Sequence, residues 1–289
     1  MTVVRSEIMG FCSGVRTAVE MLERAVSQGA RETRPVYTIG PLIHNEQFLT
    51  YASAKGVKVI ESPEDAPPGI AVVRAHGIPP GDRQRFTDAG FTLLDGTCVR
   101  VKRSQQLVHQ HTRQGVAVLI AGDAHHGEVV SLQGFAIQPG MVHVVKSTAD
   151  IAALQLDTSV LLIAQTTFSR ESYREIQEYL LAHKEELGMH SLEIVDSICP
   201  ATKQRQEALK GLAAKTDGVV VIGGKHSANT RRLYELVRGM GRPAWLISQA
   251  KEITDEMKSL NSVGLTAGAS TPQWVIDEIA AELTRSILQ

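Results

Sequence analysis

The 289-residue sequence has only three cysteines, few aromatic residues and no excess of charge of either sign. Lys and Arg (30) nearly balance Asp and Glu (31), which excludes a protein that binds nucleic acid through bulk charge. Aromatic residues make up 4%, which argues against platforms on which bases stack. No run of about 18 apolar residues occurs, and the N-terminus has no apolar signal region. We therefore expect a cytoplasmic protein with no membrane partner and no nucleic-acid partner.

An odd number of cysteines in a cytoplasmic protein argues against a disulfide framework. A single cysteine of this kind is most often a small buried apolar side chain. The positions of the three cysteines relative to the rest of the sequence indicate a different role.

Short apolar runs rich in β-branched residues alternate with segments of helical periodicity along the chain. This alternation is typical of an α/β protein with mainly parallel strands. The final segment begins Thr271-Pro272, a good helix opening, and we predict a C-terminal helix over 271–289. The runs that we expect to be strands are 36–39, 70–73, 116–120, 160–163, 219–222 and 263–266.

The sequence around the second cysteine nearly repeats around the third. TLLDGTC ends at Cys98 and EIVDSIC ends at Cys199, and each cysteine precedes a helical segment. An apolar strand then ends in glycine 24 residues after each cysteine, at Gly122 and Gly223. His126 and Ser227 both follow their cysteine by 28 residues, and Glu128 and Asn229 follow by 30.

The first third of the chain follows the same plan more loosely. Cys12 precedes a helical stripe, and the strand after it leads to His44-Asn45-Glu46. Each third also has a later apolar strand that ends in polar residues, which are His76, Thr166 and Ser270. Because α/β sheets bind ligands at the carboxyl ends of their strands, each repeat brings one cysteine and two polar strand ends to such an edge.

We therefore predict three α/β lobes related by a pseudo-threefold axis, in a trefoil-like arrangement around a central site. The predicted lobes are residues 13–97 with Cys12 at the entry, residues 98–198 and residues 199–270. Residues 1–12 are a candidate extra strand of the third lobe, and 271–289 form the C-terminal helix.

Three thiolates at such an edge suggest a metal site. The sequence has no Cys-x-x-Cys, so neither a thioredoxin motif nor a zinc ribbon fits. Zinc with histidine as the fourth ligand is one interpretation. A [4Fe–4S] cluster is another; such clusters usually have four cysteine ligands, so three leave one iron open to a substrate.

Nine short motifs follow one another from about residue 10 to about residue 272. They are GFCSGV, IHNE, RAHG, DGTC, HHGEV, AQTT, SICPATKQRQEA, GGKHSAN and TAGAST. In this collinear order they resemble the family of 4-hydroxy-3-methylbut-2-enyl diphosphate reductases, the last enzymes of the non-mevalonate isoprenoid pathway.

The resemblance implies a three-lobed fold around a [4Fe–4S] cluster held by Cys12, Cys98 and Cys199. It implies an iron–sulfur oxidoreductase that removes the allylic hydroxyl with two electrons and two protons, giving isopentenyl and dimethylallyl diphosphate. Reduced ferredoxin or flavodoxin is the electron donor that the resemblance implies. The catalytic candidates are Glu128 as the proton-delivering carboxylate, His126 and Thr166. The substrate-binding candidates are His44, His76, His126, Thr166, Ser227, Ala228 through its backbone N–H, Asn229 and Ser270.

The chain departs from the family pattern close to these motifs. Val99 follows the second cysteine where the family has proline, and Gly127 replaces the proline of the family's His-Pro-Glu loop, which here is His126-Gly127-Glu128. Ala228 replaces the second serine of a Ser-Ser-Asn run, and Lys203-Gln204 replaces Thr-Asn. The departures leave open a paralogous iron–sulfur reductase or hydro-lyase with another small substrate. A third alternative is a non-enzymatic cluster-based sensor, against which the His-x-Glu loop argues.

Overall fold

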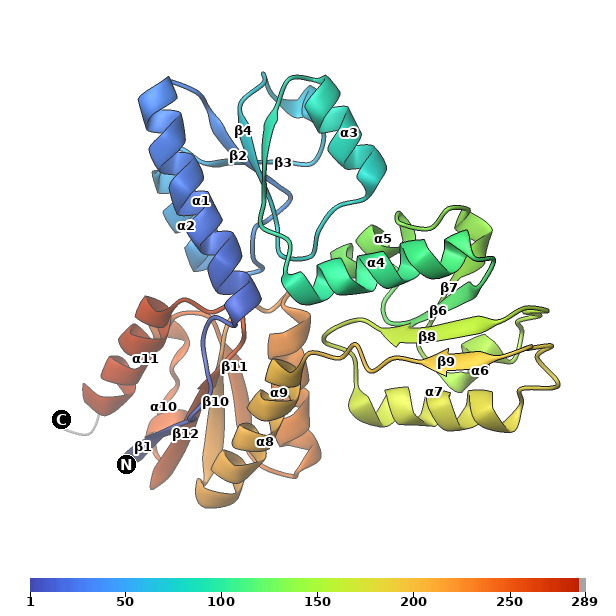
Figure 1. Cartoon of the computed structure of the whole chain (residues 1–289). Helices are drawn as coiled ribbons and strands as arrows, with labels where there is room; N and C mark the ends of the chain where they lie inside the picture. The colour runs from blue at the N-terminus through green and yellow to red at the C-terminus, as the bar shows by residue number, and fades with distance from the viewer. Residues whose placement is uncertain (286–289) are drawn as a thin grey trace. The chain divides into compact units, whose positions relative to one another are not determined.

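The computed structural model describes residues 1–285 and has the predicted α/β class (Figure 1). Three four-stranded sheets and the helices between their strands make up the described chain. The strands are β1 (Thr2–Arg5), β2 (Val36–Ile39), β3 (Lys58–Ile60), β4 (Ile70–Val73), β5 (Thr92–Asp95), β6 (Ala117–Ala121), β7 (Val142–Val145), β8 (Val160–Ala164), β9 (Leu192–Ile194), β10 (Gly218–Ile222), β11 (Ala244–Ile247) and β12 (Ser262–Ala267). The α-helices are α1 (Ser13–Glu32), α2 (Glu46–Ala54), α3 (Pro80–Asp88), α4 (Val99–Arg113), α5 (Gly127–Gln133), α6 (Thr148–Ile151), α7 (Arg170–Ala182), α8 (Pro200–Lys215), α9 (Ala228–Gly239), α10 (Asp255–Lys258) and α11 (Gln273–Arg285).

All six strands expected from the apolar runs are present, as β2, β4, β6, β8, β10 and β12. The helix expected over 271–289 is α11, which starts at Gln273 directly after Pro272 and runs to Arg285. Residues 286–289 of that prediction lie outside the described residues.

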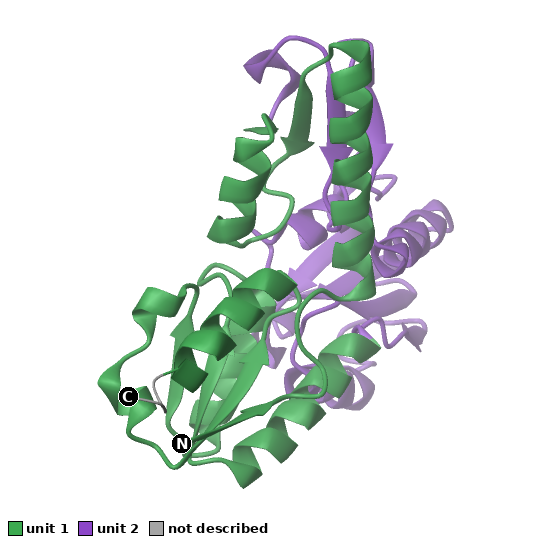
Figure 2. Cartoon of the chain, turned by 90° about the vertical axis from the view of Figure 1, so that its left-hand side faces the viewer, with its two compact units in different colours: residues 1–59, 200–289 green, residues 60–199 purple. Residues whose placement is uncertain are grey.

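The chain divides into two compact units, residues 1–59 with 200–289, and residues 60–199 (Figure 2). Unit 1 contains the sheet β1-β12-β10-β11, and unit 2 contains the sheet β7-β6-β8-β9. Every neighbouring pair in these two sheets is parallel. The remaining four strands are β2, in unit 1, β3, which ends at the first residue of unit 2, and β4 and β5, which pair in parallel in unit 2.

The unit 1 sheet is covered on both faces. Val275, Ile276 and Ile279 of α11 pack on β12 and β10 residues of one face. Helices α8 and α9 cover the other face, where Leu212 and Leu233 pack on β10. Strands that are buried on both faces read as continuous apolar runs, as GVVVI does in β10.

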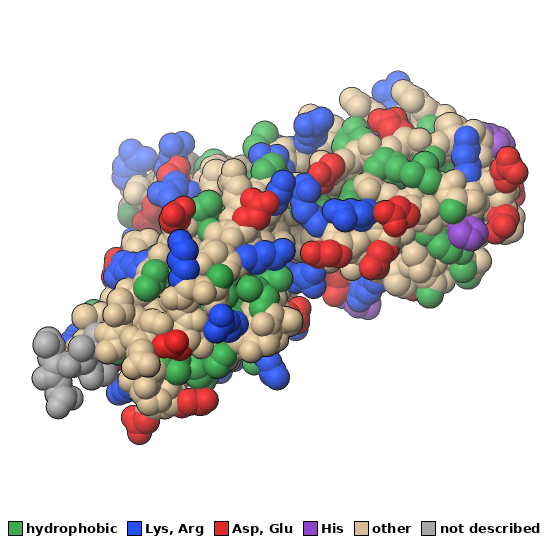
Figure 3. All heavy atoms as spheres, turned by 90° about the horizontal axis from the view of Figure 1, so that it is seen from below, with side chains coloured by type: hydrophobic (Ala, Val, Ile, Leu, Met, Phe, Trp, Pro, Cys, Tyr) green, Lys and Arg blue, Asp and Glu red, His purple; other side chains and the backbone are tan. Residues whose placement is uncertain are grey.

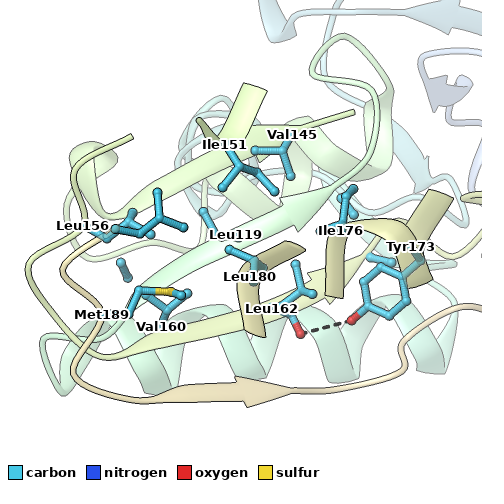
Figure 4. Packing of buried hydrophobic residues seen from close by; sticks show 14 of the residues in the cluster. Leu119, Val145, Ile151, Leu156, Val160, Leu162, Tyr173, Ile176, Leu180 and Met189 are labelled. Carbon is cyan, nitrogen blue, oxygen red and sulfur yellow. Dashed lines mark hydrogen bonds between the residues drawn. The ribbon is translucent and has the colours of Figure 1, made fainter. Parts of the chain in front are cut away.

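The unit 2 sheet has the same layered construction. Tyr173, Ile176 and Leu180, spaced three and four residues apart on α7, pack against β6 and β8 on one face (Figure 4). The hydroxyl of Tyr173 donates hydrogen bonds to the carbonyl oxygens of Leu162 (3.2 Å) and Val195 (2.9 Å), so its polar end is satisfied within the core. Helices α4 and α5 supply Val108, Val129 and Leu132 to the opposite face. Because helices pack on both faces of each sheet, the ends of the strands are held in place, and so are the loops that follow them.

Charged side chains of both signs are interspersed over the face drawn in Figure 3, in keeping with the net charge of −1. Among residues 1–285, no helix combines the length and the apolar character that crossing a membrane requires.

Candidate active site

The three cysteines occupy equivalent places in three sheets. Each follows a strand (β1, β5 or β9) that pairs with β12, β4 or β8, and each directly precedes a helix (α1, α4 or α8). In each case the cysteine N–H donates to a carbonyl just beyond the end of that neighbouring strand. The three bonds are Cys12 to Ala269 (3.3 Å), Cys98 to Ala75 (3.0 Å) and Cys199 to Thr166 (2.9 Å). Every cysteine therefore lies at the carboxyl edge of its sheet, as the repeats predict.

The surroundings of the cysteines suit thiolate ligands. All three side chains are partly exposed, and none forms a disulfide within the described chain. Cys12 caps α1, and its Sγ accepts the Val15 N–H at 3.5 Å. Unsatisfied N–H groups at a helix N-terminus favour negative charge at such a position. The donor set of three sulfurs thus fits an iron–sulfur cluster.

Among residues 1–285, no group of three or more His, Cys, Asp or Glu side chains is arranged to hold a metal ion. In a [4Fe–4S] cluster the cysteine thiolates bind separate irons, so the sulfurs need not converge on one point. Cys12 belongs to unit 1, and Cys98 and Cys199 belong to unit 2, so the meeting of the three stays a prediction.

Glu128 is a buried carboxylate that belongs to the first turn of α5. Only 1% of the residue is exposed. Its carboxylate accepts the Thr166 backbone N–H at 2.7 Å and the Thr166 hydroxyl at 2.6 Å. Burial raises the pKa of Glu128 to about 7, although the two hydrogen bonds from Thr166 lower it. A carboxyl group with this pKa can hold and release a proton near neutral pH.

Two of the predicted pocket histidines meet in the same unit. The rings of His76 and His126 lie edge to face, with centroids 4.9 Å apart. His126 caps α5, and its Nδ1 accepts the Glu128 N–H at 3.2 Å. This bond assigns the proton of a neutral His126 to Nε2 and leaves that nitrogen as a donor. Histidine, glutamate and threonine therefore form one connected group with Cys199 in unit 2.

The guanidinium of Arg74 covers the backbone at Gly127. A Cβ at position 127 would lie 2.7 Å from Nη2 of Arg74. Arg74 comes two residues before His76, at the end of β4. Arg74 thus occupies the space that a side chain at position 127 would need, which accords with glycine rather than proline there. The sequence alone does not indicate this contact.

Unit 1 carries a second group of predicted residues. Ser227 caps α9, and its Oγ accepts a hydrogen bond from the hydroxyl of Ser270 at 3.2 Å. Asn229 is 9% exposed, and its Nδ2 has no hydrogen-bond partner among the described residues. Ala228 is the first residue of α9, where backbone N–H groups are not used within the helix. Two hydroxyls, an amide donor and a helix N-terminus thus gather at one place, a combination that suits an anion.

The backbone of His44 lies against the loop that follows β10. A Cβ on Gly224 would overlap the carbonyl oxygen of His44, so the loop after β10 runs directly against the loop after β2. Glycine is required here because any side chain would collide with backbone. The structure thus brings His44 next to the loop that leads to Ser227.

The chain has a clear relationship to known proteins. The family model described as "LytB protein" matches residues 3–284. The chain belongs to the LytB family. A LytB-family relative from Treponema denticola, named 4-hydroxy-3-methylbut-2-enyl diphosphate reductase, is 40% identical over 98% of this chain and 99% of its own length. A relative of the same name from Aquifex aeolicus is 33% identical over 97% and 95%.

Two solved structures have the same architecture. E-1-hydroxy-2-methyl-but-2-enyl-4-diphosphate reductase from Plasmodium falciparum superposes with a TM-score of 0.88 at 26% identity, covering 98% of this chain and 88% of that one. (E)-4-hydroxy-3-methyl-but-2-enyl diphosphate reductase, the terminal enzyme of the non-mevalonate pathway, gives a TM-score of 0.72 at 33% identity and covers 99% and 100%. This LytB chain is an enzyme of the reductase family, as the motifs predict, with three parallel-sheet α/β lobes of four strands each.

Proposed function

We propose that the protein reductively removes the hydroxyl of 4-hydroxy-3-methylbut-2-enyl diphosphate and releases isopentenyl and dimethylallyl diphosphate. Two electrons and two protons are consumed: the hydroxyl leaves as water with one proton, and the other is added to carbon. The names of the full-length relatives support this substrate.

Cys12, Cys98 and Cys199 are the residues that would hold a [4Fe–4S] cluster. Their equivalent places at three sheet edges, each followed by a helix N-terminus, support this assignment. When bound, such a cluster supplies electrons and, at the iron without a cysteine, a Lewis-acid position. Reduced ferredoxin or flavodoxin would donate the electrons.

The observation that carries the proposal is the buried Glu128 with its partner Thr166. Hydroxide is a poor leaving group, so the reaction needs a proton donor at the hydroxyl. The protonated Glu128 can donate to Oγ1 of Thr166, and that hydroxyl can then turn its own proton toward substrate. The Thr166 carbonyl is bound by the Cys199 N–H at 2.9 Å, which ties the proton path to a proposed ligand.

The diphosphate would be held by neutral donors in unit 1. Ser227, Asn229 and Ser270 offer side-chain donors, and the first N–H groups of α9, Ala228 included, add backbone donors. His44, His76 and His126 would complete the substrate pocket. Loss of one hydroxyl at Ala228 leaves its backbone N–H in place.

We also propose lobe boundaries at 13–97, 98–198 and 199–270, with β1 completing the last lobe and α11 closing it. The matching positions of the cysteines in the three sheets support these limits. Cytoplasmic location is part of the same proposal, since reduced clusters need a reducing compartment.

The test is anaerobic purification followed by turnover with the allylic diphosphate and a strong one-electron reductant. We expect a brown protein with about four irons and four sulfides per chain and reductant-dependent formation of both products. A colourless protein that takes up no cluster would refute the proposal. Brisk turnover would exclude a paralogous enzyme with another substrate, and a substrate-dependent change in the cluster spectrum would exclude a sensor.

Glu128→Gln is the matched variant for the proton donor. The amide keeps the size of the side chain but has no carboxyl proton to deliver. We expect the variant to keep the cluster and lose turnover; full activity would contradict the assigned role.

A further inference from the structure

A buried arginine lies at the meeting point of three segments of unit 1. Arg205 belongs to α8, the helix that begins directly after Cys199, and only 3% of it is exposed. Its Nη1 donates to the carbonyl oxygen of Ala267 at 3.0 Å, and its Nη2 donates to that of Gly10 at 3.0 Å. These two acceptors are 62 and 195 residues away in sequence.

The two carbonyls belong to segments that carry proposed site residues. Gly10 comes two residues before Cys12 and has a left-handed backbone, with φ of 74°. Ala267 ends β12, and Ala269 follows it with the carbonyl that accepts the Cys12 N–H. Ser270 is the next residue. The segment that contains Gly10 and Cys12 and the segment that contains Ala267 and Ala269 are joined directly by the Cys12–Ala269 hydrogen bond. Arg205 joins the same two segments a second time, through its two hydrogen bonds.

Arginine suits this position better than any other residue. Its planar guanidinium presents several donors in a fixed fork, so one side chain can reach two separate carbonyl oxygens. A lysine ammonium is a single point charge and cannot hold the same two-point geometry. Burial of a charged group is costly, so a side chain in this place has to be satisfied by its hydrogen bonds.

We propose that Arg205 is a positioning residue. It fixes the Cys12 loop (residues 10–12) relative to the Ser270 loop (residues 267–270). It acts through the two carbonyl oxygens that it binds, by setting the place of Cys12, a proposed cluster ligand, relative to Ser270, a proposed diphosphate-binding hydroxyl. The effect of Arg205 on the cluster and on substrate binding rests on the proposed function. The connection that its two hydrogen bonds make between the two loops, called the clamp below, does not.

The first experiment uses the apoprotein, in which each cysteine can be followed separately by alkylation with iodoacetamide and mass spectrometry. Losing two charge-assisted hydrogen bonds should let the Cys12 loop open more often. We expect Arg205→Met to accelerate alkylation of Cys12 about tenfold and to leave Cys98, in unit 2, unchanged. Lys210→Met, an exposed change on the same helix, should leave both rates unchanged.

Arg205→Lys keeps the charge and shortens the reach, so we expect a smaller acceleration confined to Cys12. Equal Cys12 rates in wild type and Arg205→Met would overturn the clamp. Equal acceleration of Cys12 and Cys98 in both Arg205 variants would also overturn it, because that pattern reports general unfolding.

The second experiment uses the reconstituted protein. Arg205→Met should lose its cluster to a chelator about tenfold faster than wild type and should raise KM for the allylic diphosphate more than it lowers kcat. Arg205→Lys should restore part of both effects. If Arg205→Met lost its cluster at the wild-type rate and kept the wild-type KM, Arg205 would have no positioning role for the cluster or the substrate. Failure of wild type to bind any cluster would refute the proposed function, while the alkylation result would still decide the clamp.

Discussion

The Thr166 hydroxyl lies 2.6 Å from the Glu128 carboxylate, and the Thr166 N–H reaches the other carboxylate oxygen at 2.7 Å. Two donors from one residue hold a carboxylate that burial would otherwise keep protonated. The same group therefore has two nearly balanced protonation states near neutral pH. A proton donor that must be reloaded in every catalytic cycle needs this balance.

Stability should depend on pH through Glu128. The pKa in the folded state, about 7, lies above the usual value of 4.5, so the folded protein binds this proton more tightly than the unfolded chain. The contribution of Glu128 to the free energy of unfolding is thus fully present below pH 4.5 and is lost as pH rises through 7. The loss is at most about 3 kcal/mol. Denaturant unfolding between pH 4 and 8 measures it, and the Glu128→Gln variant should lack this component.

Removing the Thr166 hydroxyl should raise the pKa of Glu128 further, because the hydroxyl stabilises the charged carboxylate. In Thr166→Val we expect turnover to fall and the alkaline limb of its pH profile to move up by about one unit. Thr166→Ser keeps the hydroxyl and is the matched control. Profiles with the same limb for valine and serine would show that the hydroxyl does not act on Glu128.

Asn229 should matter for substrate and little for folding. Because its Nδ2 has no partner among the described residues, Asn229→Ala removes no hydrogen bond of that group. We expect the free energy of unfolding to change by less than about 1 kcal/mol, and KM for the allylic diphosphate to rise roughly tenfold or more. Thr230→Val removes a neighbouring buried hydroxyl that also has no partner within the described chain, and should leave KM unchanged. An unchanged KM in Asn229→Ala would exclude a contact to the diphosphate.

Adding one methyl group at Gly224 should separate two loops. The new Cβ would collide with the His44 carbonyl, which is backbone and cannot rotate away. We expect Gly224→Ala to lose about 1–3 kcal/mol of stability and to raise KM, measured by thermal unfolding and steady-state kinetics. Gly239→Ala, at the end of α9 with open space around it, is the control and should be neutral or slightly stabilising.

The central strands could be predicted from sequence because they are buried on both faces, which makes apolar runs such as VLLIA in β8. No prediction covers β3, β7 or β11. These strands have only three or four residues and are less buried than the central strands, as in β3 with two exposed residues of three, so a short apolar run does not by itself mark them as strands. Pairing with a neighbouring strand, which no local pattern encodes, is what defines them.

The sequence predicts those residues of the candidate site that lie in short, recognisable motifs. The motif around each cysteine and the His-x-Glu loop can be read within a few residues, whereas the sequence relates Glu128 to Thr166 only through their positions in the repeat. The sequence does not single out Arg205, because the carbonyl oxygens that it binds lie 62 and 195 residues away in the chain. One signal was available: Arg205, Leu209 and Leu212 share a helical spacing of four and three, so a charged residue occupies a core-facing position of α8.

The pairing of β1 with β12 has a consequence for synthesis of the protein. Thr2 pairs with Ser262, and the Cys12 N–H is bound by Ala269, so these partners leave the ribosome long after β1 and Cys12 do. At about 5–20 residues per second, the delay is on the order of tens of seconds. During translation the first cysteine is thus the last to gain its native neighbour. Correct loading of a three-cysteine site would have to wait until nearly the whole chain has been made.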